Sequence, residues 1–96
     1  MKYTENAFLS TKITFFNEMH MLHKKLNCKS SYEEFANLVG LDNRIGISHT
    51  KVPGPDKKFG WGGHCFEKDN YELQLFSNSD LIKFIRKLNK KHRRRK

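Results

Sequence analysis

A cysteine and an aspartate follow a glycine-rich segment and could together carry out nucleophilic chemistry. Residues 59–69 read Phe-Gly-Trp-Gly-Gly-His-Cys-Phe-Glu-Lys-Asp. The glycines allow a tight turn and close approach to a ligand. If a helix begins near Gly63, Cys65 lies in its first turn, where free N–H groups favour a thiolate. Asp69 then lies one turn further on the same face, as an acid–base group would. A buried cysteine beside a solvated aspartate has the same spacing.

The N-terminus offers a second pair of polar side chains. Lys2 and Asn6 are one helical turn apart. An ammonium and a carboxamide on one face of a helix can stabilise a developing oxyanion together. A surface lysine beside a helix-capping asparagine gives the same pattern, so both interpretations stay open for this pair alone.

A long first helix is expected to position the N-terminal pair. Residues 4–27 contain neither glycine nor proline, and their apolar side chains follow two separate helical spacings. A helix that is apolar on two sides must be buried on two sides. We expect one side to pack on the chain's own helices and the other on a second subunit. One series is Phe8, Phe15, Met19, Leu22 and Leu26, and the other is Leu9, Ile13, Phe16 and His20.

Capping and breaking signals predict three further helices. Residues 31–34 form a capping box, Ser-Tyr-Glu-Glu, and Gly40 ends the helix that they begin. Residues 42–63 hold most of the glycines and both prolines, which predicts a long loop of a kind that is usually functional or disordered. A third helix should span about 65–76, and a fourth should begin at Ser79. No alternating strand pattern is present, so the predicted fold class is all-α.

Size and cysteine content limit the class of protein. The 96 residues are enough for one small domain or for part of a larger protein. No segment reaches the apolar length of a membrane span, and the N-terminus does not resemble a signal peptide. The two cysteines, Cys28 and Cys65, could pair only by removing the candidate nucleophile. We therefore expect a reducing, cytoplasmic setting.

The net charge of +9 comes entirely from the C-terminal end. Residues 1–80 contain ten basic and ten acidic residues, whereas residues 81–96 contain nine basic residues and no acidic one. A terminal basic run is typical of a solvated helix end or a frayed tail. We therefore expect no nucleic-acid partner. We also predict no metal site, because the candidate ligands lack a complete set with metal-binding spacing; they are His20, His23, Cys28, His49 and His64.

Three segments, in order, resemble the central domain of the UDP-glucose/GDP-mannose dehydrogenase family. Residues 2–18 resemble the start of that domain, and residues 41–56 resemble the stretch that precedes its active-site loop. Residues 60–69 look like the signature Gly-Phe-Gly-Gly-x-Cys-Phe-x-Lys-Asp. Trp61 replaces the usual phenylalanine, and we expect its larger ring to crowd the loop. The resemblance implies a central domain over residues 1–88 and a truncated connecting helix over 89–96.

The resemblance implies an NAD-dependent oxidation of a sugar nucleotide, UDP-glucose or a relative such as GDP-mannose, at its C6 alcohol. Cys65 would form a thiohemiacetal and then a thioester, and Asp69 would act as acid–base or position the water. Lys2 and Asn6 would stabilise the oxyanion. The resemblance also implies binding residues. Arg44 would reach the substrate across a homodimer formed through helix 4–27, and Lys68 would contact NAD. The loop residues that would line the substrate site are Phe59, Gly60, Gly62 and Gly63.

The cofactor domain of that family is not visible in the sequence. No Gly-x-Gly-x-x-Gly fingerprint follows a predicted strand. We therefore expect no turnover by this polypeptide alone and a requirement for a separate NAD-binding chain. The alternative is a non-catalytic dimerisation module that pairs with itself or with a full-length dehydrogenase.

Overall fold

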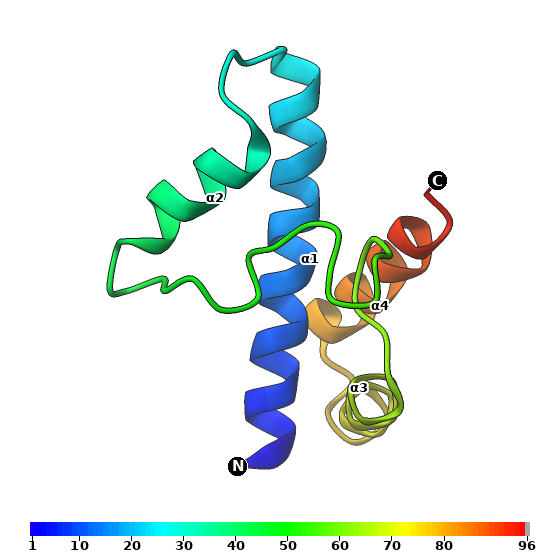
Figure 1. Cartoon of the computed structure of the whole chain (residues 1–96). Coiled ribbons are helices and arrows are strands. Elements are labelled where there is room, and N and C mark those ends of the chain that lie inside the picture. The colour runs from blue at the N-terminus through cyan, green and yellow to red at the C-terminus, as the bar shows by residue number, and fades with distance from the viewer. Residues whose placement is uncertain (96) are drawn as a thin grey trace.

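The computed structural model describes residues 1–95, and these residues form four helices and no strand. The helices are α1 (Lys2–Leu26), α2 (Tyr32–Gly40), α3 (His64–Ser77) and α4 (Asp80–Arg93). In Figure 1, α1 runs the length of the molecule, with α2 on one side and α3 and α4 on the other. The loop between α2 and α3 passes across α1. The all-α prediction is confirmed.

Local sequence signals explain where the helices begin and end. Ser31 Oγ accepts the Glu34 N–H at 3.1 Å, and the Glu34 side chain reaches back to Ser31, so the predicted capping box is formed. Ser79 caps α4 with one bond, in which its Oγ accepts the Ile82 N–H at 3.3 Å. Gly40 ends the second helix as predicted and is its last helical residue. A Cβ added at this position would lie 2.8 Å from Ile47 Cδ1. Glycine therefore allows the following loop to pass close to the end of α2.

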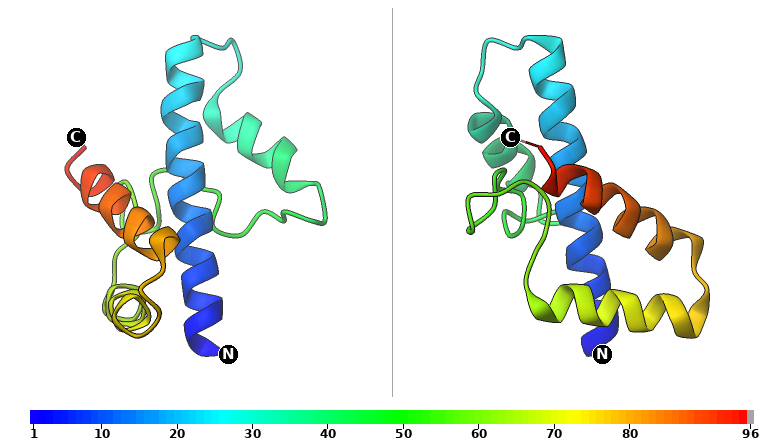
Figure 2. Two further views of the ribbon diagram at one scale, coloured as in Figure 1. Left: turned by 180° about the vertical axis from the view of Figure 1, so that it is seen from behind. Right: turned by 90° about the vertical axis from the view of Figure 1, so that its right-hand side faces the viewer.

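The two faces of α1 differ from the predicted pair of apolar faces. The face toward α3 and α4 is buried, but small and polar side chains form it: Ala7, Ser10, Thr14 and Asn17. Phe16 is also buried, but it lines the groove on the other side of α1 together with Phe8 and Phe15. The apolar side chains of the other face are exposed, with Phe8 65% and Phe15 53% accessible. Figure 2 shows α3 and α4 crossing α1, which both helices contact. A small apolar core, Ala7, Ile82 and Ile85, lies between them.

A half-buried tyrosine attaches α2 to the rest of the chain. The Tyr32 hydroxyl donates to the Thr50 carbonyl at 2.7 Å. Burial raises the pKa of Tyr32 to about 12, so the hydroxyl keeps its proton for this bond. The contact ties the beginning of α2 to the loop that leads toward the glycine-rich segment.

The basic C-terminal end is only partly solvated. Lys90, Lys91 and Arg94 are exposed as predicted, but His92 is fully buried. The Nε2 atom of His92 lies 2.7 Å from the Glu18 carboxylate. Arg95 lies over the Phe59 ring, 4.0 Å from its centroid. The frayed-tail prediction is wrong for this part of the chain because these side chains hold α4 to α1 and to the loop. Lys96 lies outside the described residues.

None of the helices within residues 1–95 has the length and apolar character needed to cross a membrane.

Candidate active site

The glycine-rich loop ends where α3 begins. Gly63 is the N-cap of α3 and has a φ of 94°, a conformation that L side chains rarely adopt. Cys65 is the second residue of the helix and is exposed. The predicted position of the thiol in the first turn is therefore confirmed. The free N–H groups of that turn are oriented toward the end of the helix at which the thiol lies.

Asp69 lies one turn further along α3 and is almost fully buried, with 1% of its surface accessible. Its Oδ2 atom accepts a hydrogen bond from Asn6 Nδ2 at 2.7 Å. Its Oδ1 atom has no partner among the described residues. The alternative of a buried cysteine beside a solvated aspartate is therefore wrong, because the exposures are reversed.

Lys2 and Asn6 share a face at the beginning of α1. Met1 is the N-cap of that helix, so Asn6 is an interior residue and not a cap. Asn6 joins α1 to α3 through Asp69. The Lys2 side chain is exposed and makes no hydrogen bond or ion pair with residues 1–95. The structure thus brings Asn6 and Asp69 together and leaves Lys2 free at the same end of α1.

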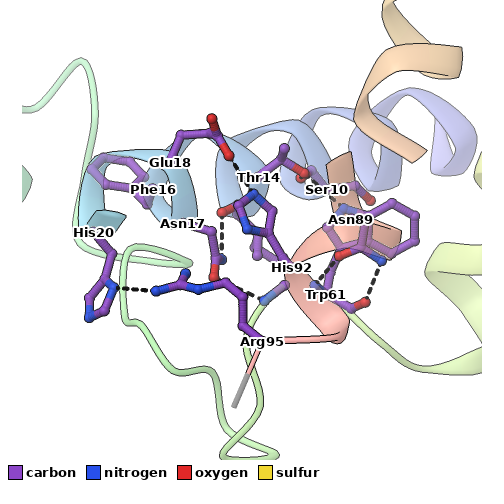
Figure 3. A network of polar contacts seen from close by, with 12 residues as sticks. Ser10, Thr14, Phe16, Asn17, Glu18, His20, Trp61, Asn89, His92 and Arg95 are labelled. Atoms are coloured by element: carbon purple, nitrogen blue, oxygen red, sulfur yellow. Dashed lines mark hydrogen bonds and ion pairs between the residues drawn. The ribbon is translucent and has the colours of Figure 1, made fainter. Parts of the chain in front are cut away.

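Two asparagines hold the backbone of the glycine-rich loop in the buried network drawn in Figure 3. Asn17 Oδ1 accepts the Gly60 N–H at 3.0 Å. Asn89 Oδ1 accepts the Trp61 N–H at 2.7 Å, and its Nδ2 donates to the Trp61 carbonyl at 2.8 Å. Gly60 has a φ of 79°, and a Cβ there would lie 2.4 Å from Asn89 Oδ1. Only glycine fits this position without displacing the asparagine.

Trp61 is part of the core and does not crowd the loop. Its surface is 2% accessible, and its Nε1 donates to Thr14 Oγ1 at 2.9 Å. Its ring meets Phe66 edge-on, with 6.3 Å between centroids. Because the indole N–H has a buried partner, tryptophan links the loop to α1 at a position where phenylalanine would leave that bond unmade.

The other predicted loop residues divide between two surroundings. Gly60, Gly62 and Gly63 line a groove of about 320 Å³ beside the loop, together with His49 and Phe66. The Phe59 ring packs instead against Arg95 and His20. A Cβ on Gly62 would lie 2.3 Å from Arg93 Nη2. Arg93 also binds Asp56 at 2.9 Å and holds the pKa of that carboxyl below its usual value.

Arg44 lies away from the candidate catalytic residues. Its guanidinium binds Asp42 at 2.7 Å and, through these hydrogen bonds, lowers the pKa of that carboxyl. It lines a second groove together with Phe8 and Phe15, on the exposed apolar face of α1. Lys12 donates to the Ile45 carbonyl at 2.7 Å and fixes the turn that carries Arg44.

Neither a metal ion nor a dinucleotide has a built site in residues 1–95. No group of three His, Cys, Asp or Glu side chains there could hold a metal ion. The described residues contain no strand, and hence no strand–turn–helix unit of the dinucleotide-binding type. Lys68, predicted to contact NAD, is exposed and lies 4.0 Å from Glu72 of the same helix. The residues present do not fit an NAD site.

Sequence reasoning missed the side chains that hold the loop. Asn17 and Asn89 lie at helix positions that face the interior, where an unpaired amide is costly. In α4 the buried series Ile82, Ile85 and Asn89 follows a 3–4 spacing, so Asn89 interrupts an apolar stripe. A polar residue in such a stripe was the available signal.

The structure is an all-α unit with an exposed cysteine after a glycine-rich loop. An amide–carboxylate pair lies one helical turn beyond the cysteine. These features match a known class of domain. The chain matches the model of the UDP-glucose/GDP-mannose dehydrogenase family, central domain, over residues 1–91. It belongs to this family. No solved structure matches the chain.

Individual relatives agree with the family match. The chain is similar to UDP-glucose 6-dehydrogenase of Rickettsia felis, with 45% identity over 72% of this chain and 14% of the relative. It is also similar to two Bacillus subtilis proteins, UDP-glucose 6-dehydrogenase YwqF, 37% identical over 93% of this chain, and UDP-glucose 6-dehydrogenase TuaD, 36% identical over 97%. The matches cover 20% of each of these two relatives. The chain thus spans a fifth or less of the length of these curated relatives.

Proposed function

We propose that this chain supplies the nucleophilic cysteine of a sugar-nucleotide dehydrogenase, acting on UDP-glucose or a related sugar nucleotide. The observation that carries the proposal is the Asn6–Asp69 hydrogen bond of 2.7 Å, one turn from an exposed Cys65. It joins the beginning of α1 to the beginning of α3. A thiol, a carboxylate and an amide from two helices thereby share one end of the molecule.

The chain's own residues account for the covalent steps at the sugar's C6. The Cys65 thiolate attacks the carbon of the C6 aldehyde, and the carbonyl oxygen gains the negative charge. Lys2 and Asn6 stabilise that oxyanion, which then takes up a proton to give the thiohemiacetal. Removal of a hydride and that proton gives the thioester. NAD is the hydride acceptor that the family implies, and another segment or chain would hold it, because residues 1–95 contain no strand–turn–helix unit of the dinucleotide-binding type.

Hydrolysis of the thioester is assigned to Asp69. A water attacks the thioester carbon, the C–S bond breaks, and the products are the uronic acid and the free Cys65 thiol. The Oδ1 atom of Asp69 is buried and has no partner within residues 1–95, and in this proposal it positions that water or takes its proton. Asn6 keeps the other carboxylate oxygen occupied, so the carboxylate cannot rotate freely.

We further propose a homodimer through α1, which would give Arg44 its role in binding the substrate. The exposed apolar face of α1 carries Phe8 and Phe15, and Arg44 lies beside it. Pairing of two such faces would bring Arg44 of one subunit toward the sugar nucleotide of the other.

Residues 59–63 line the substrate site in this proposal, and Lys68 reaches NAD held by another segment or chain. In this proposal the central domain spans 1–88, the end of α4 beyond it is part of the basic connecting helix, and the setting is the reducing cytoplasm.

The second candidate function is a non-catalytic dimerisation module. The same exposed face of α1 favours it, because pairing through this face requires none of the active-site side chains. The module would pair with itself or with a full-length dehydrogenase. It differs from the first candidate in having no need for Cys65.

A complementation assay separates the two functions. The purified chain is mixed with NAD and UDP-glucose, alone and together with a separately expressed NAD-binding domain of a UDP-glucose dehydrogenase. We expect no NADH from the chain alone and NADH from the mixture, and we expect Cys65→Ser to abolish it. A mixture whose activity survives Cys65→Ser, or a complementing domain that gives none with the unaltered chain, would refute the catalytic proposal.

A further inference from the structure

Asn17 of α1 and Asn89 of α4 hold consecutive peptide units of the glycine-rich loop. Between them they make three hydrogen bonds to the backbone of residues 60 and 61, at 2.7 to 3.0 Å. Both side chains are buried, with 2% and 6% of their surface accessible. A buried peptide group that loses its partner is costly, so these amides fix where the loop backbone lies. Figure 3 shows both side chains turned toward the loop.

A second set of contacts fixes the chain on the other side of Cys65. Asn70 Nδ2 donates to Ser10 Oγ at 2.8 Å, next to the bond between Asp69 and Asn6. Cys65 therefore lies between one anchor at residues 60–61 and another at residues 69–70. The segment between the anchors begins with two glycines, which restrict the backbone least.

We propose that Asn17 and Asn89 are positioning residues that set the start of α3 and thereby the place of Cys65 in its first turn. Neither side chain touches the thiol, and the inference rests on the proposed role of Cys65 as nucleophile. Without the anchor at residues 60–61, the Gly62–Gly63 step is free to rotate and the first turn of α3 frays. The N–H groups of that turn then lose their alignment toward the thiol.

Alkylation of Cys65 tests this directly in the full chain. In a Cys28→Ser background, the second-order rate constant with iodoacetamide at neutral pH is measured for Asn89→Ala and Asn17→Ala. We expect both to react about three- to tenfold more slowly than the parent, the range that loss of helix-terminus stabilisation of a thiolate supports. A rate that is unchanged or raised in both variants would overturn the proposal.

Thr50→Val is the matched control. Thr50 is also buried, and its hydroxyl donates to the Ile47 carbonyl at 2.7 Å, but it makes no hydrogen bond to residues 59–63. We expect it to lower the free energy of unfolding without changing the alkylation rate. Hydrogen exchange of the amides of residues 60–66 should accelerate in the two asparagine variants only. An equal effect of Thr50→Val on both readouts would show that Asn17 and Asn89 act through stability alone.

The measurement remains decisive if one variant fails to fold. Asn17→Ala removes a single bond to the loop and is the milder change, so it alone can carry the test when urea unfolding shows Asn89→Ala to be disordered. The readout needs neither sugar nucleotide nor NAD. A normal alkylation rate in folded asparagine variants, combined with complemented turnover that Cys65→Ser abolishes, would therefore refute the positioning role and leave the proposed function standing.

Discussion

The two faces of α1 are built in opposite ways. The face toward α3 and α4 buries Ser10, Thr14 and Asn17, each of which takes part in hydrogen bonds to the loop or to α3. The other face leaves Phe8 and Phe15 more than half exposed. Hydrogen bonds are directional and fix the geometry of the loop, whereas exposed apolar surface is typical of protein–protein contacts. We therefore expect changes on the first face to affect the site and changes on the second to affect assembly.

The largest effect should come from charging the apolar face. The double substitution Phe8→Asp and Phe15→Asp would bury two carboxylates in the proposed dimer contact. We expect the dimer dissociation constant to rise at least about 1,000-fold, or about 4 kcal/mol. Light scattering across a micromolar concentration series measures the change.

Phe76→Asp is the control for this prediction. Phe76 is 92% exposed on α3, away from α1's apolar face, so the substitution should leave the mass unchanged. A parent chain that is already monomeric at micromolar concentration would contradict the dimer outright.

The second prediction concerns the polar face at the Asn6–Asp69 pair. Asn6→Ala removes the hydrogen bond that Asp69 Oδ2 accepts and leaves a buried carboxylate without any partner within residues 1–95. We expect the free energy of unfolding to fall by about 2–3 kcal/mol, as for hydrogen bonds to buried charged groups. In an Asp69→Ala background, Asn6→Ala should lower the free energy of unfolding by much less. A coupling energy below about 0.5 kcal/mol in this urea-unfolding cycle would mean that the two groups do not stabilise one another.

The sequence predicted the elements better than it predicted the contacts. The capping box at Ser31 and the cap at Ser79 depend on neighbouring residues only, so short-range signals located these helices. Cys65 was placed correctly for the same reason. The anchoring of the loop depends on Asn17 and Asn89, which are 43 and 28 residues from their partners. No local pattern specifies a contact over such a separation.

The basic end of the chain illustrates the same limit. Charge composition alone predicted a solvated tail, and it does not distinguish His92 from its exposed neighbours. The burial of His92 follows from the crossing of α4 over α1, which places it against Glu18. Tertiary packing decides which members of a charged run are solvated.

The third prediction tests the link between loop and helix at Trp61. Trp61→Phe removes the hydrogen bond to Thr14 and leaves a small gap in the core, while Thr14 keeps its own bond to the Ser10 carbonyl. We expect a loss of about 1–2 kcal/mol in the free energy of unfolding. Thermal unfolding measures this loss of stability. Phe59→Leu is the comparison, because it removes a half-buried ring that makes no hydrogen bond. A stability equal to that of the parent would show that the indole N–H contributes nothing.

The smallest effect should be the response of the polar face to pH. Burial lowers the pKa of His92 below its ordinary value of 6.5, and the nearby Arg95 and Lys91 act in the same direction, against the attraction of Glu18. The unfolded chain therefore binds a proton near pH 6.5 that the folded chain does not, so stability is complete above this pH and falls as the pH drops below it. Partial burial and the nearby Arg95 also lower the pKa of His20, which adds to the same trend.

Urea unfolding at pH 7.5 and at pH 5.5 measures this loss, which for one proton cannot exceed about 1.4 kcal/mol per pH unit. His92→Gln should flatten the dependence, because the amide does not titrate in this range, whereas His64→Gln at an exposed position should not. A protein that becomes more stable as the pH falls from 7.5 to 5.5 would mean that the attraction of Glu18 outweighs burial. The contact between His92 and Glu18 would then be a stabilising ion pair like those at the surface. The polar face of α1 would be more hydrated than its hydrogen bonds indicate.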